Sequence, residues 1–170
     1  MKKILCLTLL LFGALAQSSV FASENIATVD LEAALRASNY SLKQYEALQS
    51  DLNYQKLIAQ IKQTRQSLDQ LQKESETKSL TWSDEQKQAH QQKGQAVYTE
   101  LSSLADQQTT TRRRLDASIQ KELAPKVEMI VNQIIDEKKI GLLIKAQAVY
   151  FRTVEFDITE ELVKKLNANE

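Results

Sequence analysis

The chain has 170 residues, of which 42% are hydrophobic, and its 22 basic residues balance 22 acidic ones. This length suits a single domain, and the balanced charge gives no electrostatic basis for binding nucleic acid. The chain has one histidine, one cysteine and no glycine-rich phosphate loop. We therefore expect no enzyme, no metal site and no cofactor.

Residues 1–22 have the features of an export signal. Two lysines precede an apolar segment, residues 4–16, which is too short to span a bilayer comfortably. Val20 and Ala22 occupy the −3 and −1 positions of a cleavage site, and a weaker alternative site ends at Ala16. We expect cleavage after Ala22 rather than an uncleaved anchor. The mature chain would then have 148 residues, no cysteine and a formal charge of −2.

The first predicted elements are a strand and a long helix. Residues 26–31 alternate in polarity, as in a half-buried strand. Ser41 and Gln44 have the spacing of a capping box, which predicts a helix from there to about residue 78. Its apolar positions have the spacing of a coiled-coil seam, with Thr64 filling a gap; they are Leu57, Ile61, Thr64, Leu68 and Leu71.

A second long helix is predicted after a short break at residues 79–83. Ser83 and Gln86 form another capping box, and acidic residues occupy the first turn, where the helix dipole favours them. The helix is expected to reach about residue 138. Its apolar stripe includes Leu101, Leu104, Leu115, Ile119, Leu123, Val127, Ile130 and Ile134. So short a connection predicts antiparallel packing, so residues 41–138 should form a hairpin arm with its tip near 79–83.

The last elements are expected to be short. Gly141 is predicted to end the second helix, and residues 142–144 to begin a buried strand. Residues 151–156 make a further strand possible. Asp157 or Thr159 is predicted to cap a final helix with acidic residues early and lysines late.

The two chain ends can together supply a base for the arm. Residues 23–40 and 139–170 are predicted to form a small β body with three strands in one sheet. The exposed edges of such a sheet favour pairing with other subunits. The predicted residues of this oligomerisation body are Val29, Leu31, Leu143, Val149 and Tyr150.

Three terminal motifs resemble the Skp/OmpH family of periplasmic chaperones. They are residues 26–31 (IATVDL), 139–150 (KIGLLIKAQAVY) and 157–167 (DITEELVKKLN). The resemblance covers the mature chain from end to end, although the arms agree only in character. Each motif alone is weak, but their order and spacing are fairly specific.

The resemblance implies a periplasmic homotrimer that is mainly α-helical with a small β body. Three hairpin arms would project like tentacles around a cavity. It also implies an ATP-independent holdase that binds unfolded outer-membrane proteins. Members of the family are often strongly basic, whereas this chain is near neutral, so its charge gives no support for carrying over contact with membrane or lipopolysaccharide. The alternative function is a structural coiled-coil spacer or adaptor of the cell envelope, which would explain the arms but not the terminal motifs.

Three residues of the arm are candidate functional positions. Leu80 and Trp82 are the large apolar residues of the predicted turn, and we expect them to contact client proteins. The alternative is that Trp82 folds back and closes the hairpin. Pro125 removes one helical hydrogen bond, and its ring clashes with the carbonyl of residue 121. We expect a bend or a restart of the helix at Pro125, either as a hinge or as a tolerated kink.

Two polar features of the arm are expected to be structural. The run Arg112-Arg113-Arg114 spreads around a helix and cannot form one patch. Folding the hairpin at its tip brings Arg112 near Asp51, which favours an ordinary ion pair between the helices over client binding. His90 lies among glutamines and lysines and is expected to be a solvated helix residue.

Overall fold

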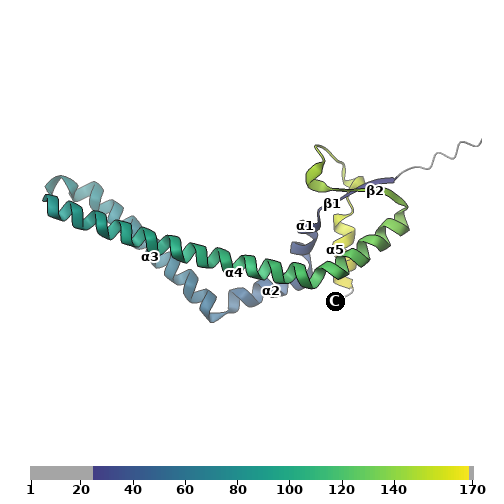
Figure 1. Ribbon diagram of the computed structural model, residues 1–170, viewed down its shortest axis with the longest axis horizontal. Helices are drawn as coiled ribbons and strands as arrows, with labels where there is room; N and C mark the ends of the chain where they lie inside the picture. Colours follow the sequence, from purple (N-terminus) through teal and green to yellow (C-terminus); the bar gives the residue numbers. More distant parts are fainter. Residues whose placement is uncertain (1–24, 169–170) are drawn as a thin grey trace, which may run out of the picture.

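The computed structural model describes residues 25–168, so the predicted export signal lies outside the described residues. The described chain consists of a long helical arm and a small base at one end of it (Figure 1). The helices and strands are β1 (Asn25–Val29), α1 (Leu31–Ala37), α2 (Asn39–Ser50), α3 (Leu52–Lys78), α4 (Asp84–Lys138), β2 (Ile140–Lys145) and α5 (Thr159–Ala168). The prediction of a mainly α fold with a small β body is confirmed.

The arm is a hairpin in which α3 leads outward from the base and α4 runs back beside it (Figure 1). A single 3₁₀ turn, Ser79–Thr81, connects them. Ser83 accepts a hydrogen bond from the backbone of Gln86, and the Gln86 side chain accepts one from the backbone of Ser83, so the predicted capping box is present. Thr64, Leu71 and Leu104 are buried between the two helices, as the predicted stripes require.

The first arm helix differs from the prediction at its beginning. Ser38, not Ser41, caps α2 by accepting a hydrogen bond from the Ser41 backbone. Ser41 is instead buried, and its hydroxyl bonds to the carbonyl of Leu35 and to the hydroxyl of Ser38. The predicted single helix is also interrupted at Asp51, which is extended and caps α3 through the backbone N–H of Tyr54.

The positions of the apolar residues explain the interruption at Asp51. Tyr45 and Leu48 are half-buried near the end of α2, and Tyr54 and Leu57 are half-buried at the start of α3. Tyr54 follows Tyr45 by nine residues, and Leu57 follows Leu48 by nine residues. This spacing is about two and a half helical turns. On one continuous helix the two stripes would therefore face opposite directions. The extended residue Asp51 resets the helix so that both stripes lie toward α4.

The base contains a two-stranded parallel sheet, in which β1 pairs with β2. The expected third strand at residues 151–156 is wrong: residues 154–156 form a 3₁₀ turn, and a single bridge joins Thr28 to Asp157. The predicted end of the second helix near residue 138 is confirmed, because α4 ends at Lys138, but Gly141 is not the residue that stops it. Lys139 then adopts the left-handed conformation, with φ of 55°. Gly141 lies within β2.

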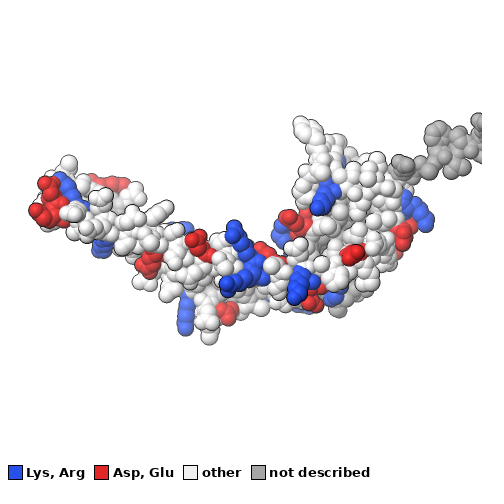
Figure 2. Space-filling model, viewed as in Figure 1, with Lys and Arg blue, Asp and Glu red and all other residues white. Residues whose placement is uncertain are grey.

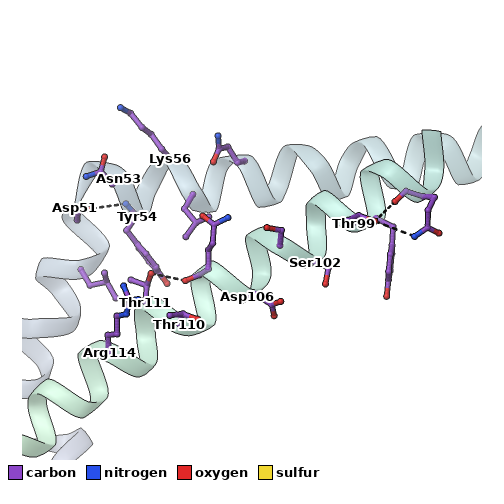
Figure 3. A pocket seen from close by; sticks show the side chains of 17 residues that line it. Asp51, Asn53, Tyr54, Lys56, Thr99, Ser102, Asp106, Thr110, Thr111 and Arg114 are labelled. Atoms are coloured by element: carbon purple, nitrogen blue, oxygen red, sulfur yellow. Dashed lines mark hydrogen bonds between the residues drawn. The ribbon is translucent and has the colours of Figure 1, made fainter. Parts of the chain in front are cut away.

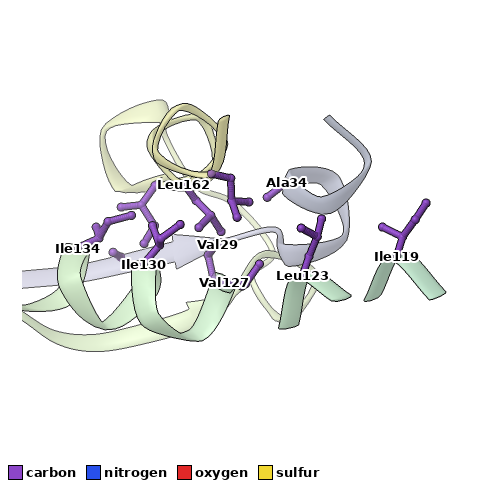
Figure 4. Packing of buried hydrophobic residues seen from close by; sticks show 11 residues of the cluster. Val29, Ala34, Ile119, Leu123, Val127, Ile130, Ile134 and Leu162 are labelled. Carbon is purple, nitrogen blue, oxygen red and sulfur yellow. The ribbon is translucent and has the colours of Figure 1, made fainter. Parts of the chain in front are cut away.

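The hydrophobic core is in the base, at the inner end of α4. Successive turns of α4 bury residues against α1, α5 and β1 (Figure 4). Leu123, Ile134 and Leu162 are completely buried. The other members of the buried cluster are Ala27, Val29, Ala34, Ile119, Val127, Ile130, Ile158 and Leu166. The base therefore anchors an arm that is mostly surface.

Candidate functional site

An exposed apolar loop follows β2 at the base. We call residues 146–158 the base loop; it projects from the body in Figure 1. Tyr150 is fully exposed, and Phe151 and Val154 are 77% and 86% exposed. Phe156 is 46% exposed. A cluster of large apolar side chains at one place on a surface is typical of a protein interface.

A groove with apolar and charged walls also lies on the base, and Gln147 of the base loop lines it. This base groove has a volume of about 740 Å³ and is open on one side. Its apolar walls come from β1, α1, α4 and β2; they include Val29, Leu31, Leu35, Val127, Val131 and Leu143. Among the predicted oligomerisation residues, Val29 is buried in the core, Leu31, Leu143 and Val149 are half-buried, and Tyr150 is exposed.

Asp157 holds the end of the base loop onto the sheet. Its carboxylate accepts hydrogen bonds from the backbone and hydroxyl of Thr159 and pairs with Arg152 at 2.8 Å. The next residue, Ile158, donates its backbone N–H to the carbonyl of Thr28 in β1. Partial burial alone would raise the pKa of Asp157, but the hydrogen bonds from Thr159 and Arg152 outweigh it and lower the pKa below its ordinary value of 3.8.

Replacing Asp157 with asparagine is expected to destabilise the base by about 1.5–3 kcal/mol at neutral pH, because hydrogen bonds to a charged group are lost. The pKa of Asp157 is lower in the folded chain than in the unfolded one. Its contribution is therefore complete above the unfolded pKa of 3.8 and is lost as the pH falls through the folded pKa. Urea unfolding followed by circular dichroism between neutral pH and about pH 2 would measure both effects.

The matched control for this prediction is Glu160→Gln. Glu160 is exposed and pairs only with Lys164 on the same helix, and such pairs contribute little. The Asp157→Asn chain should lose less stability than the wild type across the acid range, whereas Glu160→Gln should follow the wild type. Equal acid sensitivity of all three chains would contradict the role assigned to Asp157.

A second groove opens in the arm, where the break at Asp51 carries α2 and α3 away from α4 (Figure 3). This arm groove has a volume of about 990 Å³ and lies between the start of α3 and the middle of α4. Its walls mix apolar and aromatic side chains, among them Tyr54 and Leu57, with short polar ones such as Thr99, Ser102 and Thr110 (Figure 3). The short polar side chains can donate and accept hydrogen bonds without selecting one sequence.

The predicted ion pair between Arg112 and Asp51 is wrong. Within residues 25–168 no ion pair joins these two side chains, and Arg114 is the arginine that lines the arm groove with Asp51 (Figure 3). Arg112 lies near Tyr45, whose hydroxyl donates to Asp116 of α4 at 2.5 Å. This hydrogen bond raises the pKa of Tyr45 and links α2 to α4 just outside the base.

The two predicted client-contact residues at the arm tip differ in how exposed they are. Leu80 is 99% exposed. Trp82 is half-buried and packs on His90, with 4.5 Å between the ring centroids. The prediction that His90 is solvated is wrong, because its side chain is 18% exposed and faces Trp82 and Glu74. Trp82 is packed, as in the alternative in which it folds back at the tip, but the sequence did not identify His90 as its partner.

Pro125 lies inside α4, which continues through it to Lys138 without a restart. Figure 1 shows that α4 changes direction where it enters the base. The missing N–H of Pro125 removes one hydrogen bond of the helix in this half of α4. A hinge role for Pro125 stays a prediction.

The rest of the described surface is chemically mixed. Acidic and basic side chains alternate along the face of the arm shown in Figure 2. Residues 25–168 contain no group of three or more histidine, cysteine, aspartate or glutamate side chains that could hold a metal ion. In the same part of the chain, none of the helices is long and apolar enough to cross a membrane.

Comparison with known proteins agrees with the resemblance of the terminal motifs. The family model for outer membrane protein (OmpH-like) matches residues 25–166. An uncharacterized protein of Aquifex aeolicus (strain VF5) is 28% identical over 168 residues, which cover 98% of this chain and 97% of that protein. A solved OmpH-like protein of Caulobacter crescentus CB15 is 18% identical with a TM-score of 0.47, covering 88% of this chain and 87% of the other. The chain belongs to the family of OmpH-like outer membrane proteins.

Proposed function

We propose that this protein is a periplasmic holdase chaperone that binds unfolded outer-membrane proteins without ATP. Three copies would associate through their bases, and the three arms would surround the client. Membership of the OmpH-like family supports a chaperone role. The proposal rests mainly on one combination of features. A single chain has a long, polar arm, and its base leaves apolar side chains exposed.

Features of the base support association of several copies. Tyr150, Phe151 and Val154 of the base loop are exposed, and the base groove has apolar walls. β2 pairs with β1 on one side only, so within the described residues its other edge has no strand partner. An unpaired edge beside exposed apolar side chains is stabilised when another subunit covers it.

Features of the arm support binding of unfolded chains. Few apolar side chains of the arm are buried, and the walls of its groove combine threonine, serine and glutamine with apolar and aromatic side chains. Such a surface can bond to the backbone of an extended client without a preferred sequence. Leu80 at the tip offers an exposed apolar contact far from the base. We propose Leu80 and Trp82 as client contacts and Pro125 as a position where the arm flexes.

The test is suppression of aggregation. An outer-membrane β-barrel protein would be diluted from urea, without nucleotide, into buffer containing the purified mature chain, and light scattering would be recorded. We expect scattering to fall in proportion to the added protein until the molar concentration of trimers equals that of the client. An assembled protein that leaves scattering unchanged would contradict the holdase and favour the alternative of a structural spacer.

A further inference from the structure

The arm tip brings together the one tryptophan and the one histidine of the chain. The ring centroids of Trp82 and His90 are 4.5 Å apart, with the planes tilted by 40°. The Nε2 atom of His90 lies 4.0 Å from Oε2 of Glu74 on α3. His90 is thus held between the turn and the facing helix, although it belongs to α4. The side chains of Glu74, Trp82 and His90 therefore link α3, the turn and α4 at the tip.

The Nε2 atom of His90 is buried and has no hydrogen-bond partner. An unsatisfied buried polar atom destabilises the structure that contains it. Protonation changes this, because both nitrogens of an imidazolium are donors. Glu74 is about half exposed, so its carboxylate can move the short distance needed to accept a charge-assisted hydrogen bond. An imidazolium also interacts favourably with the face of an indole ring.

The charges around His90 come from both helices of the tip. Glu74 belongs to α3, and it is the carboxylate that lies within ion-pair distance of the ring. Lys78 ends α3. On α4, Lys87 and Lys93 lie one turn to either side of His90, and Lys87 pairs with Asp84 at 3.6 Å. The lysines are longer and more exposed than the histidine, so they can turn away from a positive ring.

We propose that Trp82, His90 and Glu74 form a pH-dependent clasp, which closes the arm tip when His90 is protonated and loosens when it is neutral. Histidine changes charge within the range of about pH 5–8. At acid pH the imidazolium holds Trp82 and Glu74 together. At higher pH the unsatisfied nitrogen weakens the contact, and Trp82 becomes available beside the exposed Leu80. The consequence for clients rests on the proposed function, in which the tip contacts them.

The first test needs no client. Trp82 is the single tryptophan, so fluorescence excited selectively in tryptophan reports the tip alone. A protonated imidazole in contact with indole quenches this emission. We expect emission to fall along one titration curve as the pH is lowered from about 8 to about 5. Glu74→Gln, which removes the charged partner of the imidazolium, should make the fall in emission smaller. His90→Gln and His90→Phe should abolish the titration, and the phenylalanine keeps an aromatic ring against Trp82 as a packing control.

An emission that does not change with pH in the wild type, or that titrates equally in His90→Phe, would overturn the clasp. The second test adds the client. Capture by the wild type should be weaker at about pH 5.5 than at about pH 7.5, whereas capture by His90→Phe should not differ between the two. Failure to capture clients at either pH, with a normal fluorescence titration, would contradict the proposed function and leave the clasp standing. Capture with no titration would contradict the clasp alone.

Discussion

Phe151→Asp is expected to convert the proposed trimer into a monomer. Phe151 lies in the base loop beside Tyr150 and is 77% exposed in a single chain. In the proposed trimer the neighbouring subunit covers it. A carboxylate buried there without a partner would cost several kcal/mol at each of three interfaces. Sedimentation equilibrium at micromolar concentration would measure the change in mass.

Leu80→Asp is the matched control for this assembly test. It introduces the same charge in place of another exposed apolar residue, but at the arm tip, far from the base (Figure 1). This variant should remain a trimer. If the wild type is itself a monomer at micromolar concentration, the proposed assembly is wrong. If Phe151→Asp remains a trimer, the base loop does not form the interface.

Leu123→Ala is expected to destabilise the chain by about 2–5 kcal/mol, which is the usual cost of removing a large buried aliphatic side chain. Leu123 is completely buried where α4 packs against the other elements of the base (Figure 4). A loss of this size is a large fraction of the stability of a typical domain, about 5–15 kcal/mol. Urea unfolding followed by circular dichroism would measure it, at one fixed protein concentration because assembly contributes to stability.

The control for the core substitution is Leu80→Ala, which removes the same atoms from a side chain that is 99% exposed. Its effect should stay within about 0.5 kcal/mol. The emission of Trp82 adds a second probe at the far end of the arm. If Leu123→Ala is as stable as Leu80→Ala, the buried cluster of the base is not what stabilises the chain.

Local signals predicted the arm well. The capping box at Ser83 and Gln86 depends on residues three apart, so it could be identified without knowledge of the rest of the chain. The long apolar stripe of α4 also predicted which residues would be buried, down to Ile130 and Ile134. The break at Asp51 was not predicted. Its signal was nevertheless present in the sequence, since the apolar stripes of α2 and α3 are half a turn out of phase.

Features that depend on distant partners were predicted less well. Residues 151–156 contain apolar residues that suit a strand, but in the single chain they have no strand beside them, so they form a loop and a 3₁₀ turn. The end of α4 near residue 138 was predicted, but the residues that stop it were not: Lys139, rather than Gly141, adopts the left-handed conformation, and the side chain of Asn25 donates a hydrogen bond to the last carbonyl of α4. The contact between Trp82 and His90 forms only when the tip folds.

The central claim is that three chains assemble and hold one unfolded client between their arms. The most direct measurement is the mass of the complex, by sedimentation velocity with light scattering. The mature chain would be mixed, without nucleotide, with an outer-membrane β-barrel protein diluted from urea. We predict a soluble species with the mass of three chains and one client. A client that aggregates while the chain sediments alone, as a monomer or as an empty trimer, would contradict the account.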